Sequence, residues 1–493
     1  GLAIASYEWM AAICLVCVAF LFLPKFLKSG MYTVPQFLEY RFDALSRTVM
    51  SVLMVVVLVT VNTTAVIYSG ATVANTVFGS AAELPFTLNV PVCCWAIGIM
   101  AAIYVCAGGL KACAWADLLQ GSALIIGGAL IAYFAFDAFA AKPVAEIATT
   151  AVIPEAVRSG LENANVFEKF FTLNSDKLTM FMPADHPEIP WTALIIGLWI
   201  PNFYYWGFNQ YIIQRTLGAS SLAEGQKGVI FAAGLKLIIP FIIVFPGIIA
   251  FNIYSQEQNI EALRDQRIMT TNAKNFAPLY FKGLEATNQK FDADNAARFF
   301  SFDLGQKNEK GESVKTPVFT KDEIANLKAE YDAMKASGIL DKISFKYDGG
   351  WAKSNGGLGI PAKAFVDAWN KATEKTAHKD FTRTLYGYKY DSAFGLLISK
   401  ALPEGFGLRG FIFAALLGAV VSSLAAMLNA ASTIFTIDIY KKFINKNASD
   451  RNQVLVGRIA VLVFAVIGCL VAPVLANPKL GGVFTFIQEF QGY

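Results

Sequence analysis

Long apolar stretches separated by short polar connections dominate the 493-residue chain. Most are long enough to cross the hydrocarbon core of a bilayer, which takes about 17 to 25 residues of helix. The pattern therefore predicts an all-α polytopic membrane protein, with spanning helices at roughly 3–23, 48–79, 90–107, 117–138, 191–213, 228–253, 409–440 and 454–474, and a ninth that begins near 481.

Basic residues lie in the short connections that follow the first, third, fifth and seventh predicted spans. Short connections rich in lysine and arginine stay in the cytoplasm. The two long polar stretches, 139–190 and 254–408, are then expected on the external, periplasmic side of the cytoplasmic (inner) membrane. The expected organisation is transmembrane helices in 1–253, an external hydrophilic insertion in 254–408 and further transmembrane helices in 409–493.

The insertion 254–408 is polar but not of low complexity. Thr320-Lys-Asp-Glu323 is a capping box that predicts the start of a helix. Ile324, Leu327, Tyr331 and Met334 would share one face of that helix, and Gly338 would end it. A second amphipathic helix is predicted after Pro361. We expect a small external subdomain with a possible external partner; the alternative is a mostly disordered loop, against which its aromatic residues argue.

The composition narrows the class of protein. Hydrophobic residues make up 55% of the chain and charged residues 16%, whereas a soluble domain carries about 25% charged residues. The net charge of +4 gives no reason to expect nucleic-acid binding. The seven cysteines lie in or beside apolar runs and the two histidines in separate polar stretches, so disulfides and a zinc centre are not expected. The sequence shows no Walker A motif, nucleophile elbow or Cys/His pair, so we expect neither an enzyme nor a cofactor.

The stretch Ile200–Arg215 is apolar enough to insert into a membrane but carries unusual residues. Pro201 and Gly207 are poor helix formers, and several amide side chains fall within it. Irregular backbone at membrane depth is tolerated only where it is buried in protein or lines a wet cavity. The stretch is therefore predicted to be a broken helix at a transport site.

Few ionisable residues lie within the predicted spans. Because a charge inside a bilayer costs at least about 2.5 to 3.5 kcal/mol, such residues are functional candidates. Glu8 lies near the start of the first span, where an interfacial position is the alternative explanation. Lys236 lies about a third of the way along the sixth span, too deep for its stem to reach the interface easily. Asp117 and Arg215 have simpler explanations, because they occupy the helix ends that the dipole favours for their charges.

Two further stretches combine small or polar residues with apolar ones. The run Gly418–Ser432 is typical of close helix packing, but the hydroxyl oxygens of Ser422 and Ser423 could also bind a hard monovalent cation. The last stretch, Phe484–Gln491, combines aromatic and amide side chains. Aromatic faces can cover the apolar side of a sugar ring while polar side chains bond its hydroxyl groups.

Several of these stretches resemble the bacterial sugar cotransporters of the solute:sodium symporter family. The similar stretches are Gly1–Met10, Asn202–Leu217, Ala419–Tyr440 and Phe484–Glu489. The resemblance implies the LeuT-like fold of two inverted five-helix repeats. It also implies that the visible spans are core helices two to ten, with the first core helix expected upstream of Gly1.

The resemblance also implies roles for particular residues. The expected sugar-binding residues are Glu8, Asn202, Tyr205, Lys236 and Gln488, with Tyr205 as inner gate and Phe484 as outer gate. The expected sodium ligands are Ala419, Ser422 and Ser423, and Asp117 is expected on the sodium exit path. Two features depart from the family pattern: Ala11 replaces a serine, which leaves the sugar open, and the 254–408 insertion is unusually long.

The resulting hypothesis is sodium-coupled symport of a galactose- or glucose-like monosaccharide by alternating access, with Na⁺ as coupling ion and the only metal. One alternative keeps the fold and changes the solute to an amino acid, a vitamin or another organic compound. Another is a sugar sensor that binds without transport. An enzyme within 254–408 is a third alternative, for which the sequence offers no catalytic constellation.

Overall fold

The computed structural model describes residues 1–78, 89–148, 154–184, 189–307, 313–347, 382–405 and 407–476. The chain forms two compact units. Unit 1 comprises Gly1–Val144, Ala151–Ile249 and Leu397–Tyr493, and unit 2 comprises Ala145–Thr150 and Ala250–Leu396. In the described residues, six helices are long and apolar enough to cross a membrane.

Unit 1 is built from helices, many of them interrupted by π-helical segments. Its N-terminal half contains η1 (Leu2–Ile4), α1 (Ala5–Cys17), η2 (Val18–Phe22), α2 (Leu23–Ser29), α3 (Val34–Arg41), α4 (Ala44–Val57), η3 (Leu58–Thr63), α5 (Thr64–Phe78) and α6 (Val90–Ala140). Helix α7 (Val144–Ile147) belongs to unit 2 except for its first residue, and unit 1 continues with α8 (Glu155–Gly160) and α9 (Val166–Leu173).

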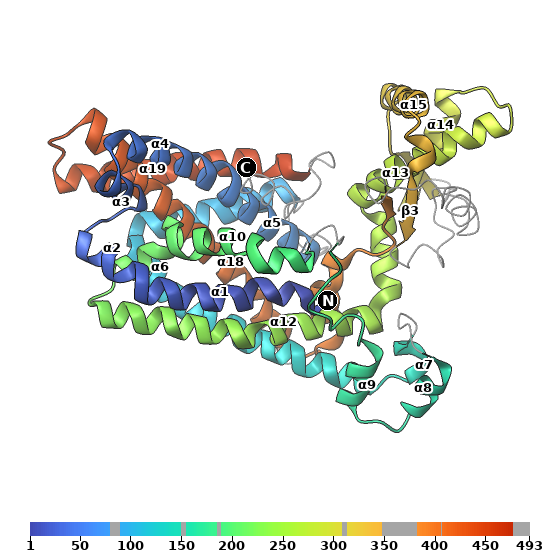
Figure 1. Ribbon diagram of the computed structural model, residues 1–493, viewed down its shortest axis with the longest axis horizontal. Helices are drawn as coiled ribbons and strands as arrows, with labels where there is room; N and C mark the ends of the chain where they lie inside the picture. The colour runs from blue at the N-terminus through green and yellow to red at the C-terminus, as the bar shows by residue number, and fades with distance from the viewer. Residues whose placement is uncertain are drawn as a thin grey trace. The chain divides into compact units, whose positions relative to one another are not determined.

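The rest of unit 1 contains the broken segment and the last long helices. These elements are η4 (Ala193–Gly197), α10 (Trp199–Phe203), η5 (Tyr204–Phe208), α11 (Gln210–Leu217), α12 (Leu222–Arg264), η9 (Leu397–Ala401), α18 (Leu408–Ile434), η10 (Phe435–Ile444), α19 (Asp450–Val471) and η11 (Ala472–Ala476). Helix α12 continues into unit 2. Helices α1 and α12 run side by side (Figure 1), and Trp9 on α1 donates through Nε1 to the carbonyl oxygen of Leu237 on α12 at 3.3 Å.

Two of the predicted spans, 90–107 and 117–138, form the single long element α6. Gly109 interrupts its helical geometry with φ 54° and ψ −151°. A positive φ of this kind is readily adopted by glycine because it has no Cβ. The two halves of α6 therefore correspond to the two predicted spans, joined at the glycine.

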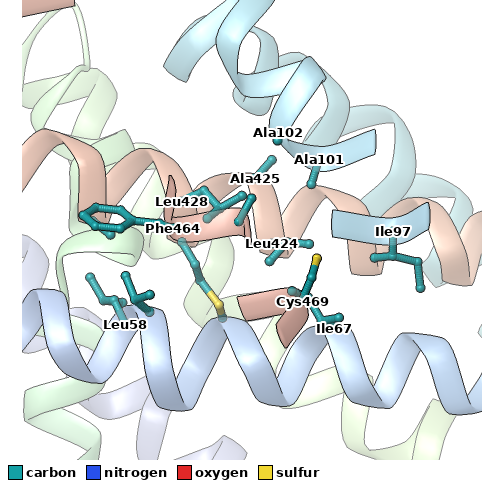
Figure 2. Close-up of a cluster of buried hydrophobic side chains, with 14 of the residues drawn as sticks. Leu58, Ile67, Ile97, Ala101, Ala102, Leu424, Ala425, Leu428, Phe464 and Cys469 are labelled. Carbon is teal, nitrogen blue, oxygen red and sulfur yellow. The ribbon is translucent and has the colours of Figure 1, made fainter. Parts of the chain in front are cut away.

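The main core of unit 1 lies where α18 packs against α6, α19 and the η3–α5 helix. Small residues line α18 on this side, and Figure 2 shows Leu424, Ala425 and Leu428 beside residues of the neighbouring helices. The close approach is clearest at Gly98, where an added Cβ would lie 2.1 Å from Sγ of Cys469. On α18 itself, Ala425, Ala426 and Ala430 are fully buried, so the small-residue run predicted from the sequence serves close helix packing there.

Unit 2 has a hydrophobic core of its own, which includes Phe276, Phe300 and Tyr331. Its elements are η6 (Leu340–Lys342), η8 (Tyr390–Ser392), α13 (Gln266–Ala286), α14 (Ala293–Phe299), α15 (Lys321–Ala336), α17 (Ala393–Leu396), β1 (Ser301–Lys307), β2 (Ser313–Pro317), β3 (Ser344–Tyr347) and β4 (Thr382–Leu385). Strands β1 and β2 pair antiparallel, with an irregularity between Asp303 and Lys307.

The second strand pair of unit 2, β3 with β4, is parallel, with Ser344 opposite Thr382. The predicted capping box is confirmed, because Thr320 caps α15 together with Glu323. Helix α15 buries Ile324 and Tyr331, and Gly338 adopts φ 67° just after it ends. The helix predicted after Pro361 lies outside the described residues.

Candidate functional site

The segment 199–217 is a broken helix, as the sequence predicted. Helix α10 passes into the π-helical segment η5, and Asn209 then adopts an extended conformation (φ −79°, ψ 120°) before α11 begins. The break therefore falls at Asn209, two residues beyond Gly207, and Pro201 lies inside α10. Trp206, before the break, contacts α12, and Gln214 and Arg215, after it, contact α18 and α6.

Glu8 and Lys236, which are 228 positions apart, form an ion pair between α1 and α12. The Lys236 side chain is 19% exposed and that of Glu8 38% exposed. The Lys236 ammonium also lies 4.3 Å from the ring centroid of Trp206, on the broken segment. This cation–π contact adds to the ion pair and brings three separate elements together around one charge.

Tyr205 and Asn202 lie on the same broken segment. The hydroxyl groups of Tyr205 and Tyr211 hydrogen-bond to each other across the break. The Tyr205 ring also packs edge-on against Trp206, with centroids 5.0 Å apart. Asn202 is buried, and its amide donates to the carbonyl oxygen of Leu198 at 2.8 Å, within its own helical segment.

A second cluster forms where α6, α11 and α18 meet. The Ser422 hydroxyl on α18 donates to Oδ1 of Asp117 on α6. Arg215 donates to the other carboxylate oxygen, with its Nε 2.6 Å and its Nη2 2.5 Å from Oδ2. The expectation that Asp117 begins a helix is wrong, because Asp117 lies inside α6, well beyond the interruption at Gly109. Arg215 does lie in the last turn of α11, but its side chain joins that helix to α6 through Asp117.

Helix α11 is also fastened by its glutamines. The Gln214 amide donates to the carbonyl oxygen of Ala426 on α18 at 3.0 Å and accepts a bond from Asn429. Gln210, fully buried, accepts from the backbone N–H of Val34 and donates to the carbonyl oxygen of Tyr32. The half-helix after the break is therefore held by polar contacts on several sides.

The remaining predicted site residues are not brought into these clusters by the described contacts. Ala419 is half-buried on α18, and Ser423 is exposed next to the buried Ser422. Phe484 and Gln488 lie outside the described residues. The sequence reasoning overlooked Trp206, Tyr211 and Gln214, although the first two belong to the same aromatic run as Tyr205.

The two clusters offer different chemistry. Around Glu8 and Lys236, a carboxylate, an ammonium group and aromatic faces lie together, which suits a ligand with hydroxyl groups and an apolar face. Asp117 and Ser422 themselves offer only oxygen atoms, the ligand type that hard cations prefer, while the Arg215 guanidinium group lies against the same carboxylate. Among the described residues there is no group of three or more His, Cys, Asp or Glu side chains that could hold a metal ion.

Residues 1–277 and 386–493 match the family model of the sodium:solute symporter family. The chain belongs to the sodium:solute symporter family. The resemblance inferred from the residues is therefore confirmed. The unmatched residues 278–385 fall within unit 2.

Individual members of the sodium:solute symporter family resemble the whole chain. A sodium/glucose cotransporter of Vibrio parahaemolyticus is 32% identical over 100% of this chain and 65% of its own length. The uncharacterized symporter YidK of Escherichia coli K12 is 25% identical over 100% of this chain and 60% of its own. Sodium/glucose cotransporter 1 of Mus musculus is 23% identical over 100% of this chain and 55% of its own. The chain thus spans less than two thirds of the length of these relatives.

A solved structure supports the fold. It is a substrate-bound, outward-open Na⁺-coupled sialic acid symporter, with a TM-score of 0.57 and 17% identity over 96% of this chain and 68% of that one. The predicted α-helical, LeuT-like membrane fold is confirmed, and the chain is a multi-pass membrane protein.

Proposed function

We propose that this symporter-family member carries a galactose- or glucose-like monosaccharide across the cytoplasmic (inner) membrane, coupled to sodium, by alternating access. The observation that carries the proposal is the Glu8–Lys236 ion pair beside Trp206. Charged groups form strong hydrogen bonds to neutral hydroxyl groups, and neighbouring aromatic rings cover the apolar face of a sugar. The similarity to sodium/glucose cotransporters supports the same substrate class.

In the proposed site, Glu8, Asn202, Lys236 and Gln488 bond the sugar hydroxyl groups, Tyr205 lies beneath the ring as inner gate and Phe484 covers it from outside. Sodium binds the carbonyl oxygen of Ala419 and the hydroxyl groups of Ser422 and Ser423, and leaves past Asp117. The contact between Ser422 and Asp117 supports this path, because an ion leaving the serine would meet the carboxylate directly.

Coupling in this scheme is a difference in affinity. Sodium favours the state that binds the sugar, and the sugar favours the state that binds sodium, by the same free energy of typically about 1 to 3 kcal/mol. Sodium is the coupling ion, and no other cofactor takes part. Long polar stretches, including 254–408, lie on the external side in this arrangement and are available to an external partner.

The sugar site is tested by equilibrium binding to the full-length protein in sodium buffer. We expect Lys236→Gln and Glu8→Gln each to weaken galactose or glucose binding about tenfold or more, because a hydrogen bond to a charged group is worth about 1.5 to 3 kcal/mol. Lys227→Gln is the matched control, since Lys227 lies on the same helix and is 74% exposed.

Unchanged sugar affinity in both Lys236→Gln and Glu8→Gln would contradict the proposed site. If an amino acid or a vitamin competes for the binding site and sugars do not, the protein carries another solute instead. A substrate carboxylate or amine would leave the paired charges of Glu8 and Lys236 poorly matched, which is why we expect sugars to compete.

A further inference from the structure

Arg215 engages the carboxylate on which the proposed sodium path depends. Its Nε and Nη2 both contact Oδ2 of Asp117, at 2.6 and 2.5 Å, while the Ser422 hydroxyl bonds Oδ1. Both oxygen atoms of Asp117 therefore have protein partners. The Arg215 and Asp117 side chains are 30% and 28% exposed, so water screens their interaction only in part.

The Arg215 guanidinium group and a sodium ion cannot both bind the Asp117 carboxylate without a cost in free energy. A sodium ion on Ser422 lies next to Asp117, since the two side chains are in direct hydrogen-bond contact. The guanidinium group neutralises the carboxylate and repels an ion placed beside it. The charge of Arg215 therefore opposes sodium binding at the same atoms that attract it.

We propose that Arg215 is a positioning residue that competes with sodium for Asp117 and so lowers the sodium affinity of the serine site. The inference rests on the proposed function, because it assumes that sodium binds at Ser422. In sodium release, the guanidinium group takes the place of the ion on the carboxylate. Asp117 is then never left as an unpaired charge within the protein, which would be costly.

The same short helix connects this competition to the proposed gate. Arg215 Nη1 donates to the carbonyl oxygen of Tyr211 at 2.8 Å, and the Tyr211 hydroxyl bonds that of Tyr205. Gln214, next to Arg215, holds α11 against α18 through Ala426. A movement of α11 that separates Arg215 from Asp117 therefore also displaces the hydroxyl partner of Tyr205.

The test measures sodium binding with no sugar present, so that it does not depend on the sugar site. Purified full-length protein is titrated with sodium chloride, choline chloride keeping the ionic strength constant, and the shift in thermal unfolding is recorded. In Arg215→Gln the half-saturating sodium concentration should fall by about three- to tenfold, because an opposing charge has been removed. Arg215→Lys keeps the charge but loses the two-nitrogen contact with Asp117, so it should lower the half-saturating sodium concentration by less than Arg215→Gln does.

Two controls separate the competition from a general effect on folding. Arg451→Gln removes an exposed arginine at the start of α19 and should leave the sodium response unchanged. In an Asp117→Asn background, Arg215→Gln should change sodium affinity by less than about twofold, because the shared carboxylate is gone. An equal effect of Arg215→Gln with and without Asp117 would overturn the inference.

If Arg215→Gln cannot be purified in a folded form, a second variant, Arg215→His, provides the test. Arg215→His carries a charge that pH can remove, so its half-saturating sodium concentration, relative to the wild type, should fall as the pH rises through about 6.5. Where the wild type responds to sodium, an unchanged affinity in Arg215→Gln overturns this inference alone, and so does an affinity of Arg215→His that stays at the wild-type value above as well as below about pH 6.5. A wild type without any sodium response contradicts the proposed function itself.

Discussion

Charged side chains within the apolar helices of this chain pair with residues far away in the sequence. Lys236 is the clearest case, because its depth in an apolar stretch predicts a functional or paired charge. The sequence cannot identify the partner, since Glu8 is 228 positions away and becomes a neighbour only when α1 packs beside α12. Glu8 itself allowed an interfacial explanation, which the ion pair makes unnecessary.

The sequence pattern does not reveal that Asp438 is buried and paired. It lies near the end of a predicted span and resembles an ordinary boundary residue, yet its side chain is fully buried. Arg47 donates to it through Nε at 2.7 Å and also contacts Glu39, which Lys442 approaches as well. This network ties α3 and α4 to η10, and only the three-dimensional packing brings its members together.

The Asp438–Arg47 pair leads to a prediction on stability. Arg47→Met should lower the free energy of unfolding by about 3 to 5 kcal/mol, because it leaves a buried carboxylate without its partner. Arg47→Met combined with Asp438→Leu should recover most of that loss. Unfolding of the full-length protein in detergent measures the stability of both variants. Arg41→Met is the control, because Arg41 is exposed. A double variant less stable than Arg47→Met would refute the explanation.

At the scale of elements, the sequence predicted the broken helix but not the residue at which it breaks. Pro201 and Gly207 indicated an interruption, and Asn209 provides the extended residue. The π-helical segments η2, η3 and η10 were not predicted, because one extra residue in a helical turn leaves the apolar pattern nearly unchanged. The strands of unit 2 were also missed, since short strands gain their stability from partners distant in sequence.

Helix packing at Gly98 provides an element-scale prediction. Gly98→Ala should destabilise the protein by about 1 to 3 kcal/mol, because the new methyl group would overlap Sγ of Cys469 between α6 and α19. Cys469→Ala in the same chain should relieve the overlap, so that the double variant is more stable than Gly98→Ala alone. Gly121→Ala, where an added Cβ meets no atom within 4 Å, is the control. If the stability changes caused by Gly98→Ala and Cys469→Ala simply add up in the double variant, the close contact is contradicted.

At the scale of the whole molecule, the fold could be predicted because membrane insertion imposes a strong pattern of apolar lengths. The family resemblance then supplied the arrangement of repeats, which periodicity alone does not contain. For the candidate site, the sequence indicated Glu8, Lys236, Asp117 and Ser422, but not that they form two clusters. Their connection through Arg215 and Tyr211 depends on how α11 docks after the break.

Sodium-coupled transport is tested most directly in liposomes that contain the full-length protein. Radiolabelled galactose or glucose uptake is followed with an inward sodium gradient, and the gradient is then collapsed with a sodium ionophore. We expect the sugar to accumulate above its external concentration and to leak out after the collapse, and we expect Ser423→Ala to abolish accumulation. Equal uptake with and without the sodium gradient would contradict symport.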